Sequence, residues 1–107
     1  KLYYLHTNGN WTATDSSAVQ SGADQLLAIS LGTDAAVDGM LIRGFFDAES
    51  ELDNFSAGKV VYVSETASKM DTAPPTTSAA FVRVVGYCTD QSKVIYFNPS
   101  GDWVELV

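Results

Sequence analysis

Few side chains of this 107-residue chain are of a type that carries out chemistry. The one histidine, His6, stands beside a turn, and the one cysteine, Cys88, lies in a run rich in valine and tyrosine. A nucleophilic thiol needs a base beside it, and His6 is far from Cys88 in the sequence. We therefore expect Cys88 to be a buried small apolar residue and His6 to bond locally or face solvent. A single cysteine also leaves no disulfide within the chain.

Carboxylates offer a second kind of chemistry, because paired acids can cleave glycosidic bonds or hold Ca²⁺. Acidic residues gather at positions 47–53, and two more lie in a loop of small residues at 32–39. The first group lacks the spacing of an EF-hand loop, which favours solvated acidic loops. The weak candidates for binding loops are Asp34, Asp38, Glu49, Glu51 and Asp53.

Several motifs that are typical of catalytic or cofactor-binding sites are absent from the sequence. It has no glycine pattern for phosphate, no nucleophile elbow and no Cys/His spacing for zinc. We predict no catalytic residue, no metal and no cofactor, and hence a protein that is not an enzyme.

The charge of the chain narrows the choice of partners. Thirteen acidic and six basic residues give a net charge of −7, and the basic residues are scattered along the sequence. Nucleic acids and anionic membranes need converging positive charge, so we expect neither as a partner. No apolar run is long enough for membrane insertion.

The apolar runs are short, rich in β-branched and aromatic residues, and bounded by Gly, Pro, Asn, Asp and Ser, as is typical of strands. They predict an all-β single domain over 1–107, a small antiparallel barrel or sandwich of about eight short strands with little or no helix. Segments 16–24 and 47–55 could each hold one helical turn, and Gly44 and Gly86 predict bends or bulges within strands. The expected strands are 2–6, 11–14, 25–31, 40–47, 60–64, 80–88, 94–98 and 103–106.

Residues 4–11 align without gaps on residues 96–103, and the tyrosine, the glycine and the tryptophan of the two segments coincide. Each copy predicts a hairpin in which the aromatic side chains meet across the strands and the glycine provides a positive φ angle. Two such hairpins could close the fold by lying side by side, and chance similarity between two hairpins is the alternative. The matched residues are Tyr4, Gly9 and Trp11 in the first copy and Tyr96, Gly101 and Trp103 in the second.

Segments 60–63 and 81–87 contain few polar residues, so both faces of these strands need cover. Association between subunits would provide it, and so would a central position in a sandwich; the sequence leaves both open. Only 18% of the residues are charged, which suits a surface partly covered by neighbours.

Segments 58–64, 82–87 and 95–105 resemble a C-terminal domain of tailed-bacteriophage virion structural proteins, of the tail fibre, spike or head-decoration type, and 26–32 and 39–44 fit the same pattern. The resemblance implies a module on the virion surface, made in the host cytoplasm, commonly trimeric in fibres and forming the C-terminal part of a longer chain. It brings no catalytic residues.

Three functions follow as hypotheses. The leading one is a trimerising module of a tail fibre that contacts other virion proteins and presents loops 16–24, 32–39, 47–57 and 67–78 to a host glycan or receptor. The second is a capsid decoration protein. The third is a carbohydrate-binding module that stacks sugars on exposed aromatic residues, with Tyr3, Trp11, Tyr96 and Trp103 as candidates.

Overall fold

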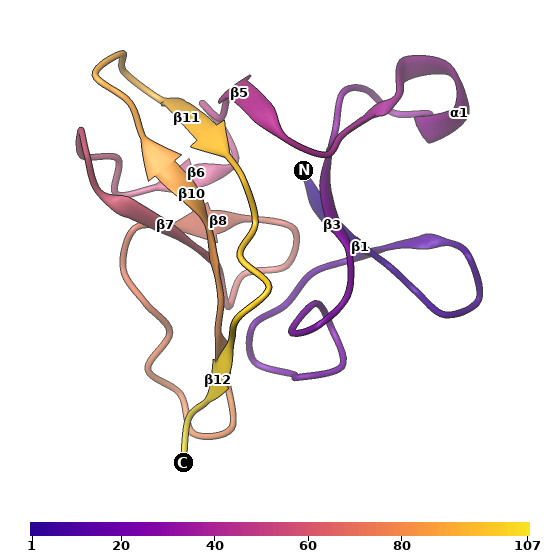
Figure 1. Ribbon diagram of the computed structural model, residues 1–107, viewed down its shortest axis with the longest axis vertical. Helices are drawn as coiled ribbons and strands as arrows, with labels where there is room; N and C mark the ends of the chain where they lie inside the picture. Colours follow the sequence, from indigo (N-terminus) through magenta and orange to yellow (C-terminus); the bar gives the residue numbers. More distant parts are fainter.

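The computed structural model describes residues 1–107 and confirms an all-β fold, with twelve strands and one four-residue helix, α1 (Ala35–Asp38). The strands form three sheets (Figure 1). The four-stranded sheet is antiparallel throughout and has the order β2 (Trp11–Ala13), β1 (Leu2–Leu5), β3 (Leu27–Ser30), β4 (Met40–Leu41).

The six-stranded sheet contains most of the second half of the chain. Its order is β5 (Gly44–Asp47), β11 (Val94–Phe97), β10 (Val84–Cys88), β7 (Val60–Val63), β8 (Met70–Asp71), β6 (Leu52–Asp53). All neighbours are antiparallel, as the sequence predicted, except the edge pair β6 and β8, which is parallel. A two-stranded ribbon joins β12 (Val104–Glu105) to β9 (Phe81–Val82).

The two larger sheets share one hydrophobic core, as in a sandwich. Figure 1 shows the four-stranded sheet, in indigo and violet, on the right and the six-stranded sheet on the left. Buried and partly exposed residues alternate along β1, β7 and β11, so each of these strands has one inner and one outer face. The inner residues include Leu2, Tyr4, Leu27, Ile29, Val61, Val63, Phe81, Val85, Ile95 and Phe97.

Two of the expected strands are each divided in two. Segment 40–47 becomes β4 and β5, which belong to different sheets, because the chain crosses between them and Gly44 adopts a φ of +139° at the start of β5. Segment 80–88 is divided at Arg83 into β9 and β10. The short strands β6 and β8 and the helix α1 were not expected, and neither 16–24 nor 47–55 forms a helix.

A bulge lies beside Gly86, the interior glycine of β10, as the sequence predicted. The register between β10 and β7 shifts between Val84 and Gly86. A Cβ on Gly86 would collide with the backbone carbonyl oxygen of Tyr96 on β11. The missing side chain therefore lets β10 and β11 approach one another.

The predicted pair of matching hairpins was wrong in its second copy. β1 and β2 form the first hairpin, and Gly9 has a φ of +87° in its turn. β12, however, pairs with β9 and not with β11, and Gly101 has no positive φ. After β11 the amides of Asn98 and Ser100 donate to β10 carbonyls, and Pro99 has no amide hydrogen, so the chain runs on past β10 without turning back.

Tyrosine and tryptophan do not meet across even the first hairpin. The register pairs Tyr4 with Thr12 and Leu5 with Trp11. Neighbouring residues of a strand point to opposite faces, so Tyr4 enters the core and Trp11 lies on the outer face. In the second copy Trp103 packs against the core, whereas Tyr96 lies on the outer face of its sheet.

Candidate functional site

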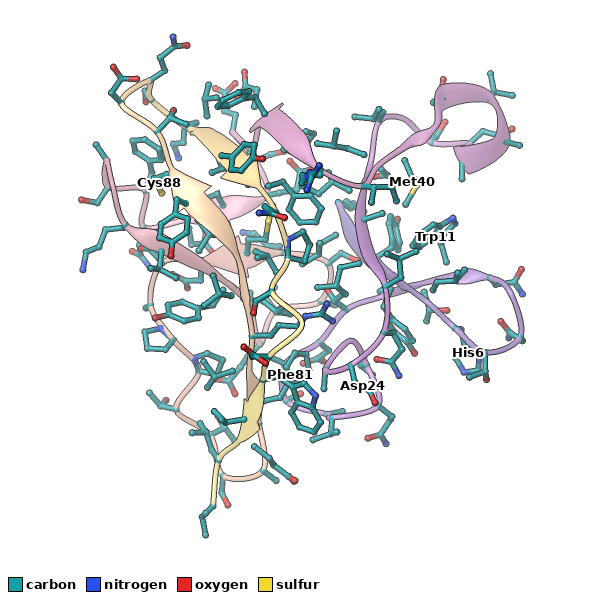
Figure 2. The ribbon with its side chains drawn as sticks, viewed as in Figure 1. His6, Trp11, Asp24, Met40, Phe81 and Cys88 are labelled. Carbon is teal, nitrogen blue, oxygen red and sulfur yellow. The ribbon has the colours of Figure 1, made fainter.

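His6 and Cys88 lie in different halves of the molecule (Figure 2). The His6 Nδ1 accepts a hydrogen bond of 3.1 Å from the amide of Asn8, and its ring centroid is 6.1 Å from that of Tyr4. Cys88 is buried in the core, as predicted. The histidine thus has local partners, and the thiol has no base beside it.

The carboxylates that the sequence analysis named as candidates each form their own local contacts and do not gather at one site. Asp34 caps α1 by accepting a hydrogen bond of 3.0 Å from the amide of Ala36, and Asp38 accepts one of 3.1 Å from the Asp34 amide. Asp53 forms an ion pair with Lys69 at 3.2 Å.

The remaining two carboxylates of that group also stay apart. Glu49 is exposed, and Glu51 accepts a hydrogen bond of 3.1 Å from the hydroxyl of Ser50 and lines a hollow described below. Nowhere in the protein do three potential metal-ligating side chains come together.

Four adjacent strands of the six-stranded sheet carry a row of uncharged residues on their outer face, which we call the aromatic row: Phe45, Tyr96, Tyr87 and Val60. Each residue is the register partner of the next. Phe45 is 71% exposed and Tyr87 is 53% exposed. The ring centroids of Phe45 and Tyr96 are 5.2 Å apart, and the angle between the ring planes is 53°. The row runs from the edge strand β5 across β11 and β10 to β7, as an uncharged and largely apolar surface.

The outer face of the four-stranded sheet contains a hollow of about 550 Å³, which we call the Tyr–Trp hollow. Tyr3 and Trp11 line it, and Figure 2 shows Trp11 and Met40 on this side of the molecule. The loop that carries α1 forms one wall and Glu51 another. The lining residues are Lys1, Tyr3, Trp11, Ser30, Gly32, Thr33, Ala35, Met40 and Glu51.

A second hollow, of about 590 Å³, lies where the chain crosses from β4 to β5, and we call it the Leu–Arg hollow. Most of its lining is aliphatic, and it contains two arginines and no carboxylate. The lining residues are Leu26, Leu27, Leu31, Met40, Leu41, Ile42, Arg43, Arg83, Asn98 and Pro99.

Arg83 is the one buried charged residue of the chain, at 7% exposure. Its Nη1 donates to three carbonyl oxygens of the 22–25 segment, at 3.0 Å, 3.3 Å and 2.6 Å, and its Nε donates to the Ser100 carbonyl at 2.8 Å. No carboxylate lies within ion-pair distance of it. Burial lowers the pKa of Arg83, against the attraction of Asp24, and a guanidinium nevertheless remains a cation at neutral pH.

Sequence reasoning missed the Leu–Arg hollow, because the basic residues are scattered along the chain and only the fold brings Arg43 and Arg83 to one surface. One signal was present: Arg83 interrupts an otherwise apolar strand segment, and a charge at an inward position needs a partner.

Comparison with known proteins gives no further guide: no family model, no curated protein and no solved structure matches the chain. None of its helical structure has the length and hydrophobicity needed to cross a membrane.

Proposed function

We propose that this domain is a non-enzymatic assembly module that associates with further copies of itself through the aromatic row. The observation that carries the proposal is the exposure of Phe45 and Tyr87, side by side with Tyr96, on a continuous face of four strands. Large aromatic side chains stabilise an interface strongly when they leave water, and exposed apolar patches of this kind mark interaction surfaces.

The inner faces of the same strands are already covered by the core, so the chain itself provides cover on one side only. Of the two ways to cover strands that are apolar on both faces, association between subunits is thus the one that this arrangement favours. The charge of −7 makes copies repel at long range, so the association depends on apolar contact and becomes stronger as salt screens the repulsion.

The setting that we propose is the surface of a phage particle, in a trimeric tail fibre or related appendage beside other virion proteins, with a capsid decoration protein as the alternative. What supports this setting is the resemblance of segments 58–64, 82–87 and 95–105 described above, together with the small share of charged residues. The loops at the ends of the sheets would face the host.

The test is the mass of the protein in solution, measured by light scattering over the micromolar range. We expect a trimer for the wild-type chain and a monomer for the double variant Phe45→Ser, Tyr87→Ser. The matched control is Val37→Ser, because Val37 is 79% exposed on α1 and lies outside the row. A wild-type protein that stays monomeric throughout this range overturns the proposal.

A carbohydrate-binding module is the second candidate, and the Tyr–Trp hollow favours it. Two aromatic side chains there adjoin Ser30, Thr33 and Glu51, which are groups that hydrogen-bond sugar hydroxyls while a sugar ring stacks on an aromatic face. Screening against a glycan panel tests this function. Trp11→Ala should abolish the binding while the fold survives, and Tyr87→Ala, on the other sheet, should leave it unchanged.

A further inference from the structure

The Leu–Arg hollow combines an aliphatic wall with positive charge, in a chain that is otherwise acidic. Two of the six basic residues line it, and none of the thirteen acidic residues does. Its volume of about 590 Å³ is within the range of roughly 300–1,000 Å³ that small-molecule sites occupy.

Part of this positive charge, the guanidinium of Arg83, is held in one position. Four hydrogen bonds to backbone carbonyls hold its guanidinium from two sides, so the group needs no reorganisation to receive an anion. All four use Nε and Nη1, whereas Nη2 takes part in none of them. Carbonyl dipoles do not neutralise a full charge, and in a partly desolvated place an unpaired cation attracts an anion strongly.

We propose that the Leu–Arg hollow binds an aliphatic carboxylate, such as a medium-chain fatty acid, with its carboxylate at Arg83 and Arg43 and its alkyl chain along the leucines. Nη2 of Arg83, which makes none of the four bonds, can donate to one carboxylate oxygen, and the exposed guanidinium of Arg43 can bind the carboxylate through two parallel hydrogen bonds. The alkyl chain leaves water against Leu26, Leu31 and Ile42, all of which are exposed in the free protein.

Other occupants fit the lining less well. A peptide would bring backbone amides and carbonyls that need hydrogen bonds, and beyond the two arginines Asn98 is the one polar side chain of the lining. A nucleotide would bring a base, and the hollow has no aromatic ring on which the base could stack. A simple inorganic anion would leave the aliphatic wall in water.

The experiment is an NMR titration of the full chain that follows its backbone amides. The probes are octanoate, octan-1-ol, which has the same chain without the charge, and the two small anions acetate and inorganic phosphate. We expect saturable shifts with octanoate at Leu26, Ile42 and Arg83, and binding of octanol weaker by about tenfold or more, because it makes no charge-assisted hydrogen bond. Acetate and phosphate should give no saturable shifts.

Variants of exposed lining residues locate the site without disturbing the hydrogen bonds of Arg83. Arg43→Gln should weaken octanoate binding by about tenfold, and Ile42→Ser should weaken it as well. Lys59→Gln is the matched control, because Lys59 is exposed and lies outside the hollow.

Three results would each overturn the proposal: octanol that binds as tightly as octanoate, phosphate that shifts the same amides saturably, or octanoate shifts confined to the aromatic row or the Tyr–Trp hollow. The association of subunits is measured separately at Phe45 and Tyr87, so either proposal can fail without the other.

Discussion

Arg83 donates a hydrogen bond of 2.6 Å from Nη1 to the carbonyl oxygen of Gln25, a residue 58 positions earlier in the chain. The bond connects the start of the six-stranded sheet's β10 to the loop that leads into β3 of the four-stranded sheet. The same guanidinium serves the carbonyls of Gly22 and Ala23, two buried residues. One side chain thus provides hydrogen-bond donors for the backbone carbonyls of a loop that lies against the core.

Arg83→Met should therefore destabilise the protein by about 3 kcal/mol, because methionine fills similar space but leaves buried carbonyls without donors. Urea unfolding followed by circular dichroism measures the change. Arg43→Met is the control and should change stability by less than about 0.5 kcal/mol, since Arg43 is exposed. Equal effects of the two substitutions would contradict the structural role of Arg83.

The sequence predicted the class of fold because its short runs of β-branched and aromatic residues are bounded by turn residues. The strands β7 and β11 are such runs and lie within the expected ranges, although only the burial of their residues alternates and the residue types do not. In segment 40–47, Arg43 interrupts the apolar run and Gly44 predicts a bend, but the sequence does not say that the chain changes sheets there, because that depends on the strands with which the two halves pair.

The two surface hollows are lined by residues that lie far apart in the sequence, so no local sequence pattern could predict them. Tyr3 and Trp11 share a face only through the register of β1 with β2. Arg43 and Arg83 line one hollow only because the fold brings the crossover from β4 to β5 close to the residue between β9 and β10. The repeat failed for a similar reason, since the pairing of the segment after β11 depends on β9 and β10 and not on its own turn residues.

Gly9→Ala and Gly101→Ala test how far the repeated segments differ. Gly9 has a φ of +87°, so alanine there should destabilise the protein by about 1 kcal/mol. Gly101 has no positive φ, and no atom lies within 4 Å of the place that an added methyl group would take, so its substitution should be neutral. Thermal unfolding of both variants gives the comparison, and a matching loss in the two would restore the hairpin interpretation of residues 96–103.

Gly86→Ala tests the close approach of β10 to β11. The added methyl group would meet the Tyr96 carbonyl oxygen, which cannot move without disrupting the pairing of β10 with β11. We expect a loss of about 3 kcal/mol in the free energy of unfolding. The substitution at Gly101 again serves as the control. A neutral Gly86→Ala would show that the two strands are farther apart than the structure places them.

Trp11→Ala and Trp103→Ala should separate a surface residue from one that supports the core. Trp103 packs against the core cluster, so its loss should destabilise the protein by about 3 kcal/mol. Trp11 lines the Tyr–Trp hollow and should have an effect of about 1 kcal/mol. Chemical denaturation monitored by the remaining tryptophan measures both. The opposite order would move Trp103 to the surface as a candidate for stacking on sugars.

Ser16 and Thr14 are both fully buried hydroxyl residues, yet their hydroxyls differ. Thr14 Oγ1 donates a hydrogen bond of 3.2 Å to the Leu2 carbonyl, whereas Ser16 Oγ has no partner. A buried polar group without a partner destabilises the folded state, so Ser16→Ala should stabilise the protein by about 1 kcal/mol. Thr14→Val keeps the shape of the side chain but loses its bond and should destabilise by a similar amount. Urea unfolding of both variants and of the wild type measures the two changes in the free energy of unfolding. If Ser16→Ala also destabilises the protein, the serine hydroxyl has a hydrogen-bond partner. The loop that Arg83 contacts would then pack around Ser16 differently from the arrangement described above.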